Sequence, residues 1–260
     1  MIILLSPAKT LDFQSEPPSK SSTELLFPEQ AEVLAKKMSK YSVASLRKLM
    51  DISEALAQEN VERFQNWALP VDKDRARQAV FAFQGDVYQG LQADTFTEND
   101  LERAQERLRI LSGLYGVLRP LDLMLPYRLE MGTSLKVSAK KPNLYAYWKE
   151  QVTAHIAGSL EQSGTDVVLN LASQEYAKVV DFKKLGCRVI APQFKEERQG
   201  RFQMISFFAK KARGLMAAFV LRNDLREAEQ LKEFDSEGYG FNEALSDMDD
   251  NKWVFTRKTK

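Results

Sequence analysis

The sequence predicts an α/β fold of mixed α+β character, with a central mixed sheet flanked by helices in a single compact domain over residues 1–260. Short runs rich in Ile, Val and Leu, such as residues 2–5 and 167–171, are typical of strands buried in a sheet. Longer segments with apolar residues three and four positions apart, such as residues 144–163, are typical of amphipathic helices. The 260 residues, 44% of them hydrophobic, provide enough chain for a large core.

In the first half of the chain these patterns predict one strand followed by helices. Residues 1–5 form the predicted strand, which ends at Ser6-Pro7, and a polar loop with two prolines follows. Helices are expected over residues 28–40 and 42–67, with Ser42 and Ser53 as caps. Residues 75–91 leave two alternatives open, a strand followed by a turn or a helix throughout.

In the second half, predicted strands and helices alternate. Residues 129–141 suggest a weak strand and a turn, and the long helix over residues 144–163 ends at Gly164. Three strands are then expected, at residues 167–171, 188–191 and 201–208, followed by a helix at 210–223 and a segment at 253–255 that closes the sheet.

The run Gly113-Leu114-Tyr115-Gly116-Val117 has the glycine spacing of the hairpin in a helix-hairpin-helix element, which we expect at about residues 98–125. Glycines let the backbone turn tightly and approach another molecule closely. Free N–H groups at the start of the second helix would then bind a phosphate, with Arg119 close by. The alternative is a plain glycine turn between two packed helices.

Three predicted strands run into small polar or basic residues, and ligands of α/β sheets bind beyond the carboxyl ends of strands. If these strands lie side by side, one cleft is lined by Lys9, Ser173, Lys210, Lys211 and Arg213. The last three are expected in the first turn of a helix, where cations oppose the helix dipole and a bound phosphate would offset the cost. The alternative is that these side chains reach solvent or pair with acidic residues elsewhere.

Composition excludes several classes of protein. The net charge is only +1, so any nucleic-acid binding requires that charge be segregated onto one face. Cys187 and His155 are the single cysteine and histidine, which argues against a zinc, haem or iron site. A hard-metal site built from carboxylates stays an alternative, and we expect no cofactor or metal. No run approaches the roughly 18 apolar residues of a membrane helix, and a cytoplasmic location is expected.

Several segments together resemble the YaaA family, nearly from end to end. They are residues 6–12, 85–88, 111–123, 126–132, 170–173 and 209–216. The resemblance implies a bacterial cytoplasmic protein of the peroxide-stress response, linked to lowering free intracellular iron and to binding duplex and branched DNA. It also implies a single unusual α/β domain with a positively charged cleft and a helix-hairpin-helix. The hairpin carries over to Gly113 through Gly116, and the cleft to Lys9, Arg128, Lys210, Lys211 and Arg213.

Two functions remain open on these grounds. The first is a DNA-binding protein without catalysis of its own, which should expose a long basic groove that joins the hairpin to the cleft. The second is an enzyme that acts on a nucleotide or another phosphate-bearing small molecule at the strand ends. An enzyme should have a closed pocket with a buried, perturbed acid or base, for which Asp12, Asp86 and Glu130 are candidates. The resemblance supplies no catalytic residues.

Overall fold

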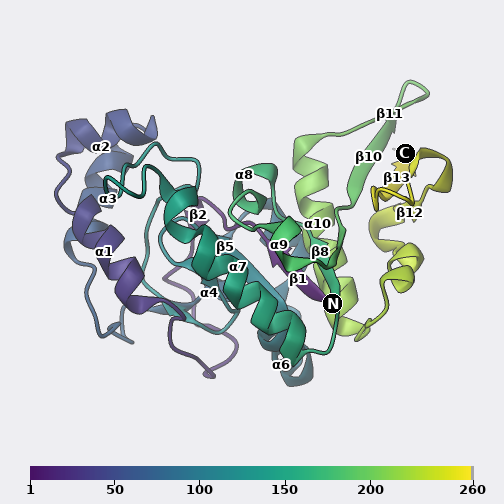
Figure 1. The fold of residues 1–260 in the computed structure, drawn as a ribbon, viewed down its shortest axis with the longest axis horizontal. Coiled ribbons are helices and arrows are strands. Elements are labelled where there is room, and N and C mark those ends of the chain that lie inside the picture. Colours follow the sequence, from purple (N-terminus) through teal and green to yellow (C-terminus); the bar gives the residue numbers. More distant parts are fainter. Residues whose placement is uncertain (259–260) are drawn as a thin grey trace.

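The computed structural model, which describes residues 1–258, has the mixed α/β architecture that the sequence predicts. Its central sheet has the strand order β6-β5-β1-β8-β9 (Figure 1). The strands β5, β1, β8 and β9 are parallel, and β6 runs antiparallel to β5. Their bounds are β1 Ile2–Leu5, β5 Leu108–Ser112, β6 Gly116–Leu118, β8 Val167–Asn170 and β9 Arg188–Ile190.

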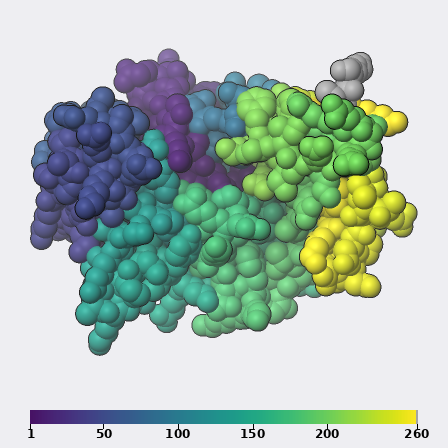
Figure 2. Space-filling model, turned by 90° about the horizontal axis from the view of Figure 1, so that it is seen from above, coloured from purple at the N-terminus to yellow at the C-terminus, as the bar shows by residue number. Residues whose placement is uncertain are grey.

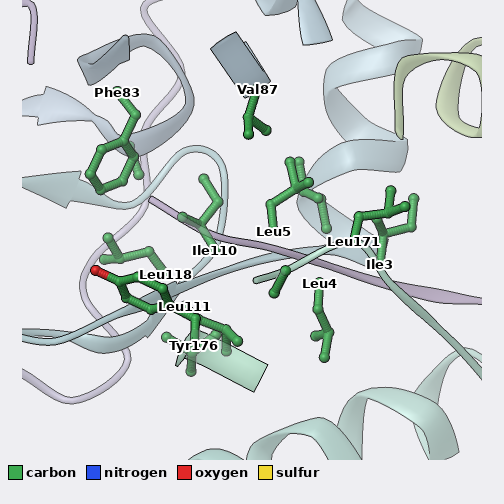
Figure 3. Packing of buried hydrophobic residues seen from close by; sticks show 14 of the residues in the cluster. Ile3, Leu4, Leu5, Phe83, Val87, Ile110, Leu111, Leu118, Leu171 and Tyr176 are labelled. Atoms are coloured by element: carbon green, nitrogen blue, oxygen red, sulfur yellow. The ribbon is translucent and has the colours of Figure 1, made fainter. Parts of the chain in front are cut away.

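The position of β1 in the middle of the sheet explains why its sequence is continuously apolar. Helices cover both faces of the sheet, so residues on either side of the strand are buried. Figure 3 shows Ile3 and Leu5 directed towards Val87, with Leu4 directed to the opposite side. Val87 belongs to α5 (Asp86–Leu91), which packs against α10 (Ser206–Arg222). On the other face, α7 (Leu144–Gln162) contacts β1 and β6.

A second sheet, in the order β11-β10-β13-β12, forms the C-terminal part of the molecule. It comprises β10 (Gln193–Arg198), β11 (Arg201–Gln203), β12 (Gly240–Phe241) and β13 (Val254–Lys258). The predicted closing segment at 253–255 therefore pairs with β10 and β12 rather than with the central sheet. Aromatic rings fill the core beneath it, with Phe194 and Phe255 stacked at 5.7 Å between centroids.

The predicted helices before residue 70 are present as α1 (Pro28–Met38), α2 (Val43–Met50) and α3 (Glu54–Gln65). Ser42 and Ser53 cap α2 and α3 as expected. Residues 75–91 combine both alternatives, because short strands alternate with short helices. The remaining elements are β2 Thr10–Leu11, β3 Arg77–Gln78, α4 Ala79–Ala82, β4 Phe83–Gln84, η1 Ala93–Thr95, α6 Glu98–Arg107, β7 Leu123–Met124, α8 Gln174–Ala177, α9 Phe182–Leu185, η2 Ala228–Glu233, η3 Ser236–Gly238 and η4 Glu243–Leu245.

The predicted helix-hairpin-helix is wrong, because a β-hairpin takes its place. The first helix, α6, ends at Arg107, and residues 108–112 continue as β5. Leu108 and Leu111 fit the helical spacing of α6, but both are fully buried in the sheet, where β5 lies between β1 and β6. Pairing with two neighbouring strands therefore overrides local periodicity. The residues after Gly116 form β6 rather than a second helix.

Two further predictions differ from the structure. Residues 129–141 contain no strand. The expected strand at 201–208 ends at Gln203, and α10 begins at Ser206, four residues earlier than the sequence suggested. The apolar run Ile205-Ser206-Phe207-Phe208 is too short for its spacing to distinguish a strand from a helix. Among residues 1–258, none of the helices has the length and apolar character needed to cross a membrane.

Candidate functional site

Two strand ends that the sequence singled out meet in the structure. Ser6 directly follows β1, and Ser173 lies three residues beyond β8, the strand that pairs with β1. The backbone N–H of Ser173 donates to Oγ of Ser6 at 2.8 Å, and the two hydroxyl oxygens are 3.3 Å apart. The third predicted strand end is absent from this sheet, since β11 belongs to the C-terminal sheet.

The molecule is hollowed near this edge of the sheet. In Figure 2 the hollow lies between the blue lobe of α1 to α3 and the green region that contains α10, with purple N-terminal residues visible between them. We call the carboxyl edge of β1 and β8, together with the side chains around it, the strand-end cleft. It includes Ser6, Lys9, Arg128, Glu130 and Ser173.

A shared carboxylate organises two cations in this cleft. Nζ of Lys9 lies 3.4 Å, and a terminal guanidinium nitrogen of Arg128 3.2 Å, from the same oxygen of Glu130. Lys9 is 68% exposed, whereas Arg128 is mostly buried. Within residues 1–258, Nε of Arg128 has no hydrogen-bond acceptor. A single carboxylate leaves these two cations with a net positive charge at the cleft.

Lys210 reaches the same cleft from α10. Ala8 Cβ lies 3.6 Å from the position that a Cβ would occupy on Gly85, and a carboxylate oxygen of the adjacent Asp86 lies 4.0 Å from Nζ of Lys210. Lys210 can approach Asp86 because α5 and α10 pack closely together. A Cβ on Gly214 would lie 1.8 Å from the carbonyl oxygen of Val87, so only glycine permits the approach.

The other two predicted cations of α10 differ in their surroundings. Lys211 forms an ion pair with Glu237 of η3, so it faces the C-terminal sheet and not the cleft. Arg213 is half-buried one turn beyond Lys210, and desolvation lowers its pKa. No acceptor or carboxylate within residues 1–258 pairs with Arg213. The expectation that these residues occupy the first helical turn is wrong, because α10 begins at Ser206, and their charges therefore do not oppose the dipole at the start of the helix.

The predicted hairpin residues cannot contact a phosphate, because Gly113, Leu114, Tyr115 and Gly116 are all buried. Trp148 Nε1 donates to the carbonyl of Gly113 at 2.9 Å, and Tyr115 OH donates to the carbonyl of Leu125 at 3.0 Å. A Cβ on Gly113 would lie 2.1 Å from the carbonyl oxygen of Leu129. Gly113 therefore admits the chain segment that carries Arg128 and Glu130, and the turn is a packing feature.

Arg119 lies at the opposite edge of the sheet. Strand β6 runs antiparallel to β5, so its far end returns to the amino ends of the parallel strands. There Arg119 Nε donates to Asp122 at 2.9 Å, and Asp122 is fully buried. Arg119 also donates to the carbonyl of Glu24 at 2.8 Å. This ion pair ties residues 23–24 to the sheet and does not contribute to the cleft.

Sequence reasoning missed the tyrosines at the strand ends. Tyr88 OH donates to the carbonyl of Ser6 at 3.0 Å, and the hydroxyls of Tyr127 and Ser112 are 2.6 Å apart. Burial raises the pKa of Tyr88, Tyr127 and Tyr176, which keeps these phenols neutral. Aromatic residues at such spacings are usually core residues, so no pattern distinguished them. Among residues 1–258, no group of three or more His, Cys, Asp or Glu side chains is arranged to hold a metal ion.

Comparison with known proteins places the chain in a family. Residues 1–245 match the family described as Peroxide stress protein YaaA. This chain belongs to the YaaA family. It is similar to the UPF0246 protein of Hahella chejuensis, with 48% identity over 257 residues and 99% of each chain covered. It is also similar to the UPF0246 proteins of Saccharophagus degradans and Ralstonia nicotianae, each 48% identical over 258 residues, with 99% of this chain and 100% and 99% of theirs covered. The sequence resemblance to the YaaA family is thus confirmed.

Proposed function

We propose that this YaaA-family chain binds double-stranded or branched DNA during the response to peroxide, through contacts of the strand-end cleft with backbone phosphates. The observation that carries the proposal is the convergence of Lys9, Arg128 and Lys210. Lys9 and Arg128 share Glu130, and Lys210 pairs with Asp86, which follows the glycine that lies against Ala8. Arg213, one turn from Lys210, adds a cation without a carboxylate partner among the described residues.

The chemistry of these groups favours phosphate over base recognition. Lys9 and Lys210 are long, largely exposed cations, and each is paired with a single carboxylate. Phosphate contacts of this kind fix the position of a duplex and carry no base sequence. The segment expected to be a helix-hairpin-helix makes no such contact, because it is a buried β-hairpin. Binding should therefore be largely independent of sequence and strongly dependent on salt.

A titration of two unrelated duplexes at several salt concentrations tests the proposal. Lys9→Ala and Lys210→Ala should each weaken binding and reduce the log–log salt slope by about 0.9. Matched controls are Lys36→Ala and Lys252→Ala. Lys36 is 69% exposed and pairs with Glu32, and Lys252 pairs with Asp250, both outside the cleft. Salt-insensitive binding, strong sequence preference, or equal losses in the controls would contradict the proposal.

One observation favours a second candidate, an enzyme or receptor for a nucleotide or similar phosphate compound. Tyr88, which donates to Ser6, also lines a cavity of about 450 Å³ on its other side. Arg77, Gln84 and Gln89 provide polar groups in that cavity. Its size suits a small polar ligand. If the cleft variants leave DNA binding intact, and Arg77→Gln abolishes binding of a nucleotide in calorimetry, this candidate replaces the first.

A further inference from the structure

The hairpin of β10 and β11, with the chain that leads into α10, forms a projecting arm, residues 193–207 (Figure 1). Its tip is a two-residue turn in which Gln199 and Gly200 have φ values of 52° and 74°. Two positive φ values match the right-handed twist of a hairpin, so the arm has a defined shape. Arg198 and Arg201 face each other directly across this turn, and both are exposed.

This pair of arginines destabilises the folded hairpin, because like charges directly opposite each other on paired strands repel. Neither Arg198 nor Arg201 forms an ion pair with any residue from 1 to 258. A cation pair placed at the end of a projecting hairpin is instead suited to a polyanion.

The base of the arm exposes two large apolar side chains. Met204 is 57% exposed and Phe207 is 50% exposed, and they are only three residues apart. Lys210 of the strand-end cleft lies one helical turn beyond Phe207 on α10. The apolar pair is therefore bordered by cations on both sides.

The exposure of Phe207 is fixed by its neighbour. Phe208 packs against the guanidinium of Arg257, 4.7 Å from the ring centroid, and the ring of Tyr239 lies against the same guanidinium. Arg257 Nε also donates to the buried Glu196 of β10 at 2.6 Å. Phe208 is held against the C-terminal sheet, and the ring of Phe207 lies edge-on against it at 5.4 Å between centroids, which leaves half of the Phe207 side chain exposed.

We propose that the arm is a second DNA contact, one that holds unpaired nucleotides. Phe207 and Met204 receive a base face, and Arg198 and Arg201 receive the flanking phosphates. This rests on the proposed function of the strand-end cleft, with which the arm is continuous through Lys210. Base faces are covered in an intact duplex, so stacking on Phe207 requires a base that is unpaired or at an end.

The test compares Phe207→Ala with the wild-type protein on a fully paired duplex and on the same duplex with a central bubble of unpaired thymines. The variant should lose roughly tenfold in affinity for the bubble DNA, as expected for one lost stacking contact, and little for the paired duplex. Phe207→Trp should retain bubble binding. Val33→Ala is the matched control, since Val33 is 51% exposed on α1.

A second variant carries Arg198→Gln together with Arg201→Gln. It should fold normally, and its log–log salt slope on bubble DNA should fall by the contribution of about two phosphate contacts. The paired duplex reports on the cleft and the bubble on the arm, so the two proposals fail separately. Equal affinity of Phe207→Ala and wild type for the bubble overturns the inference. The inference is also overturned if Phe207→Ala binds bubble DNA normally and loses affinity only for vesicles of anionic phospholipid, which would make the arm a membrane contact.

Discussion

Gly116 lies directly against the indole of Trp148, so that a Cβ at position 116 would come within 2.6 Å of Cε3 of that ring. The same glycine has φ of +72°, a conformation that side chains other than glycine rarely adopt. Both constraints come from the interior of the protein. Trp148 in turn donates to the carbonyl of Gly113, so the indole holds both ends of the turn between β5 and β6.

Gly116→Val is therefore expected to destabilise the fold by about 2–5 kcal/mol, from backbone strain and overpacking together. If this turn were instead the phosphate-binding hairpin that the sequence suggested, the variant would lose more DNA affinity than stability. Urea unfolding measures the effect. Gly158→Ala in α7 is the control, because a Cβ there meets no atom within 4 Å and replaces a helical glycine, which should raise stability slightly. A Gly116→Val protein of normal stability would contradict the packing role.

Arg119→Ala should destabilise the protein by about 3 kcal/mol, because it leaves the buried carboxylate of Asp122 without its cation. DNA affinity and its salt dependence should stay unchanged, since Arg119 lies at the far edge of the sheet. Arg47→Ala provides the comparison, as Arg47 and its partner Glu54 are both exposed and such pairs contribute little. A reduced salt slope for Arg119→Ala would return Arg119 to the phosphate-binding set.

Glu130→Gln should strengthen DNA binding, because the carboxylate that Lys9 and Arg128 share also repels phosphate. A unit charge a few ångströms away in water changes the interaction by about 1 kcal/mol, or roughly fivefold in affinity. Glu54→Gln, which removes an exposed acid elsewhere, should have no effect on binding. Weaker binding by Glu130→Gln in the same titration would mean that Glu130 is needed to hold Arg128 in place.

His155 should make the protein less stable in mild acid. Burial, and then the positive charge of Arg109, lower the pKa of His155 from 6.5 to about 4. The unfolded chain is thus protonated first, and stability that is present above about pH 6.5 is lost as the pH falls towards 4. Arg109 Nε donates to His155 Nε2 at 3.0 Å, which requires the neutral ring.

His155→Gln removes this titration and keeps an acceptor for Arg109. Urea unfolding of both proteins between pH 7 and pH 4.5 should give a shallower decline for the variant. Asp122, whose pKa is raised by burial, acts in the opposite sense in both proteins and cancels in the comparison. Identical declines would show that His155 does not titrate in this range.

The parts of the fold that sequence predicted correctly are those in which local pattern and tertiary position agree. Residues 2–5 and 167–170 are apolar throughout because parallel strands in the middle of a sheet are buried on both faces. Strand β5 was missed because Leu108 and Leu111 continue the helical spacing of α6, and only pairing with β1 makes them a strand. Periodicity cannot report such pairing, since the partner lies a hundred residues away.

The candidate site divides in the same way. Placing the residues that follow β1 beside Ser173 needed only the rule that parallel strands end at one edge of a sheet. The pairing of Lys211 with Glu237 depends instead on how the C-terminal sheet meets α10, for which the sequence carries no local signal. Arg119 was different, because Asp122 stands three residues away and an ion pair could have been inferred from that spacing.

A rigid helix that carries unlike groups at fixed positions also has a direction. Phe207 and Lys210 are three residues apart on α10, hence about 4.5 Å along its axis, and η3 and α5 hold that helix in place. The order of the two groups, ring first and ammonium second, does not depend on the ligand. A nucleotide that contacts both would therefore be held at one fixed spacing along α10, without any base being read.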